Sequence, residues 1–420
     1  MAKAIRMSKT GGPEVMEYVD VEVGEPGPGE VRIRHAAVGL NFIDCYFRSG
    51  LYPQPLPAGL GQEAAGTIEA VGAGVAGFQV GDRVAYAGRP NGAYAEARVM
   101  PADILVKLPD AISFDTAAAM MLQGMTVQYL LRQTYAVQPG ETILFHAAAG
   151  GIGLIACQWA RALGVNLIGT VSSDEKAALA KQHGAAHVIN YTTENFVERV
   201  KEITGGKGVP VVYDAIGKDT FTGSLDCLRP RGMMVSFGNA SGPVPPFGVS
   251  ELVSRGSLFL TRPSLGNYVA TRPELDATAG DLFDMVESGK ISIEINQRYA
   301  LKDVGQAHAD LEGRKTTGGY PHGPAPARPR PRQSHGPSPR AGGRRRRLAQ
   351  VRAAVGGADL CGAHDRGDHL RQRSLLLLIF RRISKFFGTD LASYRGLPKT
   401  MRGSRIFLRL DRQMLPSALG

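Results

Sequence analysis

A turn of small residues carries the clearest chemical signal in this 420-residue sequence. Ala148, Gly150 and Gly153 have the spacing Gly-x-Gly-x-x-Gly, with Ala in the first place. An apolar run at 141–145 precedes them, and a helical pattern at 154–164 follows. Small residues at such a turn let a pyrophosphate approach the backbone, and the amides of the helix N-terminus face its charge. The turn therefore predicts a dinucleotide-binding site.

Strand and helix patterns alternate around this turn. A helical pattern at 174–183 is accompanied by further apolar strand patterns at 165–171, 186–190, 209–214 and 233–238. A lone glycine pattern also occurs in turns that bind nothing, but this alternation is typical of a doubly wound dinucleotide domain. We assign that domain to residues 126–262.

The first 125 residues have a different pattern. Short alternating segments such as 31–38 are separated by turn clusters at 24–29 and 87–92, which favours a small closed or partly closed β-barrel. Two loops within this region, 41–52 and 59–66, are rich in polar residues. They are the places in the predicted barrel where chemistry is expected.

Further patterns connect the two domains and follow them. An Ala-rich helix is expected at 114–133, with Ser113 as its N-cap. After residue 262 a segment, 263–318, is expected to return to the first domain. We predict that it contains a helix at 273–288, a strand at 291–295 and a helix at 301–311.

Composition excludes several classes of protein. The length and the 43% hydrophobic content allow two or three domains with sizeable cores. The four cysteines have no paired spacing, so neither a disulfide framework nor a zinc cluster is indicated. The N-terminus has no apolar signal core, and no run approaches the roughly 20 apolar residues of a membrane span. We expect a cytoplasmic protein without a membrane segment.

The net charge of +11 comes from one part of the sequence. Residues 320–420 are rich in Arg, whereas the residues before them contain more Asp and Glu than Lys and Arg. The basic balance of the whole chain is therefore no evidence that the first 318 residues bind nucleic acid.

The sequence resembles the zeta-crystallin-type quinone oxidoreductases of the medium-chain dehydrogenase/reductase superfamily. The match around the turn includes Gly140-Glu141, Leu144, Ala148-Ala149-Gly150-Gly151-x-Gly153, Gln158 and Arg161, and further matches lie at 11–15, 41–44, 48–52, 213–214 and 237–239. It extends from residue 1 to about 318. The resemblance implies an α/β protein with an N-terminal GroES-like barrel and a Rossmann domain, which forms a homodimer and reduces quinones with NADPH.

Zinc-dependent members of that superfamily place a Cys ligand in the first polar loop and Gly-His-Glu in the second. This sequence has Asn41 in the first place and Gly61-Gln62-Glu63 in the second. Asn and Gln are poor zinc ligands, so no metal is expected. Glu63 is then interpreted as a buried, hydrogen-bonded structural carboxylate.

Without a metal, the cofactor must supply the chemistry, and nearby polar groups orient the acceptor. The resemblance places Asn41 and Tyr46 in the crevice between the domains, where an amide and a phenol can donate to a quinone oxygen; Tyr52 is a further catalytic candidate. The alternative for either tyrosine is an aromatic ring that packs within the barrel.

The end of the second strand of the dinucleotide domain favours NADPH over NADH. NAD enzymes typically carry an acid there, whereas this strand ends in Ser172 and Ser173 and is followed by Lys176. Asp174 and Glu175 fit the first turn of a helix, where acids are favoured by the dipole. By resemblance, Ser173, Lys176 and Tyr191 hold the 2′-phosphate, together with Arg314.

The resemblance places other residues along the cofactor. By resemblance, Tyr129, Gly151 and Ile152 approach the pyrophosphate at the turn that contains Gly150 and Gly153. Phe237, Asn239 and Arg262 lie near the nicotinamide half. His146, beside the turn, is interpreted as a packed residue at the strand end rather than as an acid or base.

The sequence beyond about residue 318 departs from the family pattern. A short apolar strand is expected to end the chain, but a segment rich in Arg, Pro and Gly follows, without Glu and with two Lys. We interpret 319–420 as an irregular or disordered tail produced by a frameshift or read-through. The competing interpretation is a basic arm that binds nucleic acid.

Three functions remain open at this point. The first is a zinc-independent NADPH:quinone oxidoreductase. The second is an NADPH-dependent reductase of α,β-unsaturated carbonyls, because an enone and a quinone require the same geometry for hydride addition. The third is a non-catalytic protein that binds NADPH or RNA.

Overall fold

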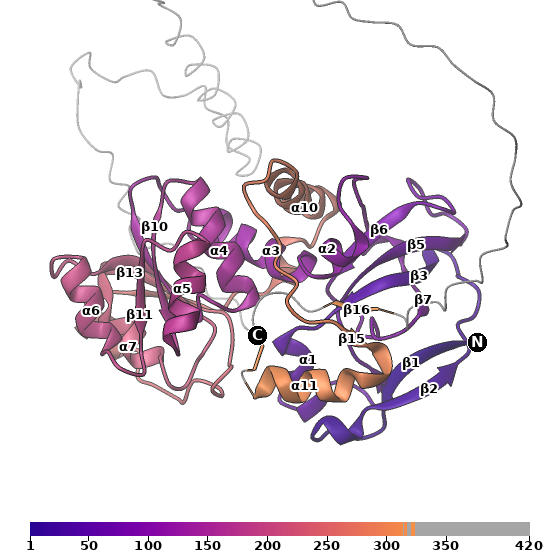
Figure 1. The fold of residues 1–420 in the computed structure, drawn as a ribbon, viewed down its shortest axis with the longest axis horizontal. Coiled ribbons are helices and arrows are strands. Elements are labelled where there is room, and N and C mark those ends of the chain that lie inside the picture. The colour runs from indigo at the N-terminus through magenta and orange to yellow at the C-terminus, as the bar shows by residue number, and fades with distance from the viewer. Residues whose placement is uncertain (314, 317–320, 324–420) are drawn as a thin grey trace, which may run out of the picture. The chain divides into compact units, whose positions relative to one another are not determined.

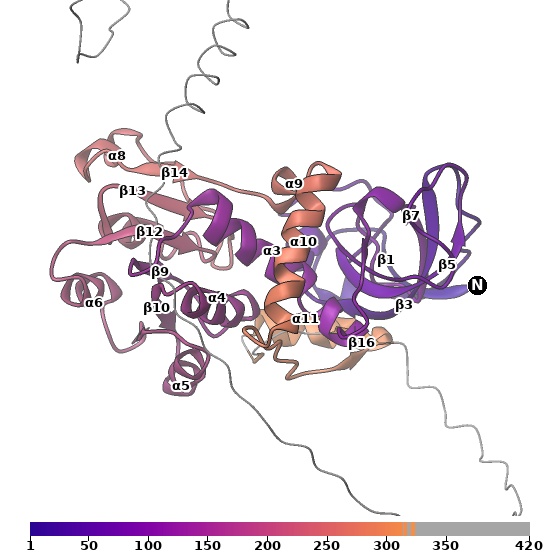
Figure 2. The same ribbon diagram turned by 90° about the horizontal axis from the view of Figure 1, so that it is seen from above.

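A computed structural model describes residues 1–313, 315–316 and 321–323 (Figure 1). A mainly antiparallel barrel sheet and a parallel sheet dominate this part of the chain. Between them lie the helices α3 (Met121–Tyr129) and α10 (Arg272–Glu287), as Figures 1 and 2 show. The expected combination of a β-barrel and a doubly wound sheet is confirmed.

The barrel has the strand order β15-β16-β3-β5-β6-β8, and β7 pairs with β3. Its strands are β3 (Glu30–Gly39), β5 (Glu63–Val71), β6 (Arg83–Ala87), β7 (Ala97–Pro101), β8 (Val106–Lys107), β15 (Tyr299–Ala300) and β16 (Pro321–Gly323). Val31 and Ile33 on β3 are buried and alternate with polar residues, as a sheet with one face on a core requires. A second sheet contains β1 (Ala2–Met7), β2 (Glu17–Val21) and β4 (Ala58–Gly59).

The parallel sheet has the strand order β11-β10-β9-β12-β13-β14. Its strands are β9 (Thr142–Phe145), β10 (Asn166–Val171), β11 (His187–Asn190), β12 (Val209–Asp214), β13 (Leu228–Ser236) and β14 (Phe259–Thr261). Its helices include α4 (Gly151–Ala162), α5 (Asp174–Gln182), α6 (Phe196–Ile203) and α7 (Phe221–Asp226). In Figure 2, α4 and α6 lie on opposite sides of the strands, as in a doubly wound fold. The order reverses at β9, so the crevice at the end of this strand is where a ligand is expected.

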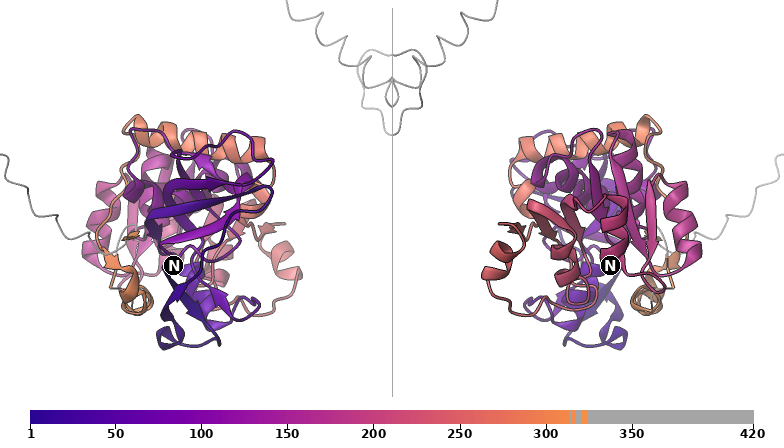
Figure 3. Two further views of the ribbon diagram at one scale, coloured as in Figure 1. Left: turned by 90° about the vertical axis from the view of Figure 1, so that its right-hand side faces the viewer. Right: turned by 90° about the vertical axis from the view of Figure 1, so that its left-hand side faces the viewer.

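Shorter helices complete the described part of the chain. They are α1 (Phe42–Ser49), α2 (Phe114–Ala118), α8 (Ser250–Ser254), α9 (Leu265–Tyr268), α11 (Val304–Glu312) and single turns at Pro13–Val15, Ala102–Ile104 and Leu301–Asp303. Figure 3 shows the barrel from one side and the parallel sheet from the other. Within the described residues, no helix has both the length and the apolar character that crossing a membrane requires.

The continuous helix predicted at 114–133 is wrong, because it is interrupted. Ser113 caps α2 as expected and accepts a hydrogen bond from the Thr116 amide at 3.1 Å. The Leu122 amide then donates to the Glu63 carboxylate at 2.8 Å instead of to a helix carbonyl. A side chain that enters the helical hydrogen-bond ladder breaks it. The helix resumes as α3 and ends in a π-helical turn at Leu130–Thr134.

The strand predicted at 291–295 is also wrong. Gln158 of α4 bonds the backbone of Ser292 at both its amide, at 2.8 Å, and its carbonyl, at 3.0 Å. This side-chain amide therefore replaces a neighbouring strand as the backbone partner. The strand in this part of the chain lies further on, at Tyr299–Ala300 (β15).

The expectation that residues from 319 onward supply no closing strand is corrected at three positions. Pro321–Gly323 form β16, which pairs antiparallel with β3 and parallel with β15. Strand pairing uses backbone groups, so a sequence of unusual composition can still supply them. The rest of the predicted tail, from 324 to 420, lies outside the described residues.

Candidate active site

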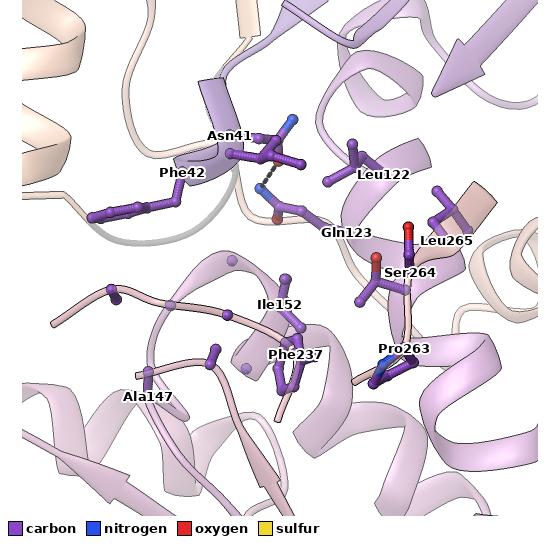
Figure 4. A pocket seen from close by; sticks show the side chains of 18 of the residues that line it. Asn41, Phe42, Leu122, Gln123, Ala147, Ile152, Phe237, Pro263, Ser264 and Leu265 are labelled. Atoms are coloured by element: carbon purple, nitrogen blue, oxygen red, sulfur yellow. Dashed lines mark hydrogen bonds between the residues drawn. The ribbon is translucent and has the colours of Figure 1, made fainter. Parts of the chain in front are cut away.

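One cavity of about 1370 Å³ lies where α1, α3 and the small-residue turn meet. It is lined by most of the residues singled out from the sequence, of which Figure 4 labels Asn41, Ile152 and Phe237. The predicted residues in its lining are Asn41, Tyr46, Tyr52, Tyr129, Gly150, Gly151, Ile152, Gly153, Lys176, Tyr191, Phe237 and Arg262. The structure therefore brings the predicted catalytic and cofactor residues to one place.

Three predicted cofactor residues are not in this lining. Ser173 is the N-cap of α5 and accepts from the Lys176 amide at 3.3 Å, and Ser172 lines the cavity in its place. Asn239 contacts the cavity residue Tyr46, because its backbone amide donates to the Tyr46 hydroxyl. Arg314 lies outside the described residues.

The turn has the backbone geometry that its small residues permit. Ala147 has a positive φ of 55°, and the Gly150 amide donates to its carbonyl at 3.0 Å. A Cβ on Gly153 would lie 2.3 Å from that same carbonyl oxygen, so this position requires glycine. Helix α4 begins at Gly151, and the amides of its first turn have no carbonyl partner within the helix. These amides can bind a phosphate.

His146 is packed at the end of β9, as predicted. Its ring is buried and bonds the hydroxyls of Thr170 and Ser224, each at 2.9 Å. Burial lowers its pKa, so it remains neutral. It fixes the end of β9 just before the turn.

One end of the cavity has the features of a phosphate site. Lys176 Nζ lies 3.4 Å from Ser172 Oγ, and Tyr191 is partly exposed beside them in the same lining. Asp174 accepts a hydrogen bond from Asn190 Nδ2 at 2.9 Å, so its carboxylate is held by the protein. Both Asp174 and Glu175 lie in the first turn of α5, as expected.

The other end contains a chain of three side chains. Asn41 Nδ2 donates to Glu63 Oε2 at 2.6 Å, and Gln123 Nε2 donates to Asn41 Oδ1 at 3.1 Å. All three residues are buried. Burial raises the pKa of the Glu63 carboxyl to about 8, although the hydrogen bond from Asn41 opposes this. Glu63 is thus the buried, hydrogen-bonded carboxyl group that the sequence predicts.

Tyr46 and Tyr52 connect this end to the parallel sheet. The Tyr46 hydroxyl accepts from the Asn239 amide at 2.9 Å, which leaves its own O–H to donate to a ligand. Burial raises the Tyr46 pKa to about 12, so the phenol stays protonated. Tyr52 accepts from Arg262 at 3.0 Å, and its ring meets that of Tyr46 edge-on. Both rings also pack within the barrel domain, so the two interpretations of these tyrosines are compatible.

Sequence reasoning missed several residues of the cavity. These include Leu122, Gln123, Thr126, Ser264 and Leu265. Gln123 lies in what the sequence presents as a regular Ala-rich helix, and no spacing distinguishes it from Gln128. Ser172 was among the hydroxyl residues that favoured NADPH, but the contact with the 2′-phosphate was assigned to its neighbour Ser173.

The side chains at the places of the two zinc ligands make protein contacts instead. Asn41 bonds Glu63 and Gln123, and Gln62 Nε2 donates to Asn91 Oδ1 at 2.7 Å. No cluster of three or more His, Cys, Asp or Glu with metal-site geometry occurs within residues 1–313, 315–316 and 321–323. A dinucleotide, in contrast, fits this cavity, because the glycine turn and the amides of α4 can hold its pyrophosphate and Lys176 can contact a further phosphate.

The raised pKa of Glu63 predicts a pH effect on stability. The Glu63 carboxyl group has an ordinary pKa of 4.5 and a pKa of about 8 in the folded protein. Its contribution to the free energy of unfolding is therefore complete below pH 4.5. This contribution is lost as the pH rises through about 8, because the folded protein holds the proton more tightly than the unfolded chain. We expect the melting temperature of Glu63→Gln to rise relative to that of the unchanged protein between pH 5 and pH 9.

Thermal melts across this pH range test the prediction. Glu69→Gln, a partly exposed position on the same strand, is the matched control for loss of one carboxyl group. A difference between Glu63→Gln and the unchanged protein that stays constant from pH 5 to pH 9 would contradict the assignment of a neutral Glu63.

Comparison with known proteins agrees with this geometry. The family model described as "Alcohol dehydrogenase GroES-like domain" matches residues 27–110, and the one described as "Zinc-binding dehydrogenase" matches residues 151–276. Quinone oxidoreductase from Pseudomonas aeruginosa is 61% identical over 319 residues, which cover 76% of this chain and 98% of that protein. A 2-haloacrylate reductase from a Burkholderia species is 49% identical over 326 residues, 76% of this chain and 98% of that protein.

Solved structures give the same result. The structure of Escherichia coli quinone oxidoreductase complexed with NADPH has a TM-score of 0.76 and 52% identity, and the match covers 77% of this chain and all of that one. The barrel is therefore GroES-like and the parallel sheet is that of a Rossmann domain. The chain belongs to the quinone oxidoreductase family of the medium-chain dehydrogenase/reductase superfamily.

Proposed function

We propose that this protein is an NADPH:quinone oxidoreductase. One observation carries the proposal, which is that a single cavity contains three features. They are the dinucleotide turn, the basic residue Lys176 and the hydrogen-bond donors Asn41 and Tyr46. Relatives at 53–61% identity are named quinone oxidoreductases, and one related structure contains NADPH. Bound NADPH supplies a hydride. The protein's own groups orient the flat acceptor and stabilise charge on its oxygen.

The residues have distinct roles in this proposal. Tyr129 and the turn residues Gly150, Gly151, Ile152 and Gly153 approach the pyrophosphate. Phe237, Asn239 and Arg262 lie near the nicotinamide half. Tyr46 donates its O–H to the acceptor oxygen, and the second hydrogen of the Asn41 amide, which the Glu63 contact leaves free, is available to the same atom. Tyr52 supports Tyr46 by its edge contact and positions Arg262.

We also propose that catalysis does not use zinc. The support is the chemistry of the donor set: amides occupy the places of two zinc ligands and are bonded to Glu63, Gln123 and Asn91. Neutral amides are poor ligands for this ion. The one carboxyl group among these residues, Glu63, is already bonded to Asn41 and Leu122.

An α,β-unsaturated carbonyl is the alternative acceptor. It is favoured by the 2-haloacrylate reductase at 49% identity, whose name denotes an alkene conjugated to a carboxyl group. The same geometry serves both acceptors, because hydride addition to either places charge on an oxygen that Tyr46 can contact.

The function is tested by following NADPH oxidation with a panel of quinones and enones. We expect turnover with quinones, at rates that exceed those with simple enones. Turnover with enones alone would replace the proposed function by the alternative, and turnover with neither class would remove the enzymatic proposal. A chain ending at Gly323, which keeps β16, serves to show whether the tail affects the rate.

The preference for NADPH is tested at Lys176. Replacing it with Glu puts a negative charge beside the site proposed for the 2′-phosphate, so the apparent KM for NADPH should rise by roughly tenfold or more. The apparent KM for NADH should change little. Lys181→Glu, on the exposed side of the same helix, is the matched control. Equal effects of Lys176→Glu on both cofactors would contradict the assignment.

We propose a homodimer formed through the edge of the parallel sheet. Its last strand, β14, exposes Phe259 and Leu260, and Val249 and Val253 near it are 75% and 70% exposed. Within the described part of the chain, no further strand pairs with β14. A strand edge of this kind with apolar side chains favours pairing with another chain. Light scattering should give the mass of a dimer, and Phe259→Lys should give a monomer. A monomeric unchanged protein would contradict the proposal.

We propose that the protein is cytoplasmic and that its tail arises from a frameshift or read-through. A cytoplasmic location is supported by the buried free thiols of Cys45, Cys157 and Cys227. Fractionation of cells tests it. The frameshift origin of the tail and its binding to nucleic acid both concern residues outside those described. Sequencing the locus around codon 318 distinguishes a frameshift from an encoded basic arm.

A further inference from the structure

Gln123 has an acceptor atom that the described residues do not use. Its side chain is 6% exposed and lines the cavity from α3. Nε2 donates to Asn41 Oδ1 at 3.1 Å, but Oε1 has no hydrogen-bond partner among the described residues. Buried polar atoms without partners are rare in folded proteins, so this atom requires an explanation.

The amide orientations in the structure leave the oxygen of Gln123 without a hydrogen-bond partner among the described residues. Asn41 uses its N–H to reach the Glu63 carboxyl group, so its oxygen faces Gln123 and must receive an N–H. The Gln123 oxygen is therefore the free end of the chain. It can accept a hydrogen bond but cannot donate one, which excludes a phosphate oxygen as its partner.

The free oxygen lies against the dinucleotide turn. A Cβ on Gly151 would be 2.2 Å from Gln123 Oε1. Figure 4 shows the Gln123 side chain between Asn41 on one side and Ile152 and Phe237 on the other. Gln123 thus connects the acceptor end of the cavity with the start of α4.

We propose that Gln123 is a positioning residue that aligns the nicotinamide half of the dinucleotide with Asn41. Oε1 accepts a hydrogen bond from a donor of that half, a ribose hydroxyl or the carboxamide N–H, while Nε2 holds the Asn41 amide. The inference rests on the proposed function for the identity of the cofactor. In Figure 4 the oxygen of the Gln123 side chain points away from Asn41, toward the side on which Ile152 lies, so it can accept a hydrogen bond while Nε2 stays on Asn41.

The assignment to the nicotinamide half follows from the layout of the cavity. The turn binds the pyrophosphate in the middle of the dinucleotide. Lys176 and Ser172 lie at the end of β10 and mark the side of the 2′-phosphate. Tyr46 accepts from the amide of Asn239, which follows β13, and β13 lies on the other side of β9 from β10. Asn41 and Gln123 line the cavity together with Tyr46, where the reacting ring must meet the acceptor.

The same helix offers a matched control. Gln128 is also on α3 and is 5% exposed, but it does not line the cavity. Its Nε2 donates to Asp281 at 2.9 Å, and its Oε1 accepts from Gln133 at 2.7 Å. Gln128→Met therefore removes a buried glutamine of the same helix without touching the proposed contact.

The test is calorimetric binding of NADPH and of 2′,5′-ADP, which lacks the nicotinamide half, to the full chain. Gln123→Met should raise the Kd for NADPH by about tenfold and leave the Kd for 2′,5′-ADP unchanged. Gln128→Met should lower the melting temperature and change neither Kd. Gln123→Asn, which retracts the oxygen but keeps the amide, is a second variant for which the same selective loss is expected.

Other outcomes would overturn the inference. An unchanged Kd for NADPH in both Gln123 variants would overturn it. An equal rise in the Kd values for NADPH and 2′,5′-ADP would also overturn it, because such a rise indicates a structural role. If the unchanged protein binds NADPH but reduces no acceptor, the proposed function fails, while the two Kd ratios still decide the role of Gln123. Failure of the unchanged protein to bind NADPH would overturn both.

Discussion

The site depends on the hydrogen bonds of one buried carboxyl group, that of Glu63. It accepts from Asn41 at the N-terminus of α1 and from the Leu122 amide at the start of α3. A buried carboxyl group without such partners would cost several kcal/mol, so these contacts are strongly selected in the folded state. They break the helix that the sequence predicts, and they direct the next residue, Gln123, toward Asn41.

In the proposed zinc-independent function, this arrangement takes the place of a metal in joining the two polar loops. A metal ion would hold its ligands from two loops at fixed distances and polarise the acceptor. Here a chain of amide and carboxyl groups holds the same loops, and burial raises the Glu63 pKa to about 8 so that little charge is left near the acceptor. In the proposed function, individual donors such as Tyr46 polarise the acceptor. Hydride transfer to a quinone needs less polarisation than transfer to an unactivated carbonyl, because the quinone is itself electron-poor.

The sequence predicts the parts of the fold that depend on local pattern. The strands of the parallel sheet, the turn at Gly150–Gly153 and the cap at Ser113 follow from periodicity and from residue type. The interruption at Leu122 does not, because it depends on a carboxyl group 59 residues away in sequence. The absence of a strand at 291–295 has the same kind of cause, since Gln158 of α4 takes its place. β16 was missed because strand pairing uses backbone groups and depends little on amino-acid composition. Gln123 was missed because its role appears only when α3 lies beside both Asn41 and Gly151.

The central claim is that one dinucleotide spans the cavity, with its phosphate end at Lys176 and its reacting ring between Gln123 and Tyr46. The most direct measurement is the electron density of a crystal of this protein grown with NADPH. The account predicts the pyrophosphate at the amides of Gly151 and Ile152, the 2′-phosphate beside Lys176 and the nicotinamide next to Asn41. Density with the nicotinamide at the Lys176 end, or a dinucleotide bound away from the turn, would contradict it.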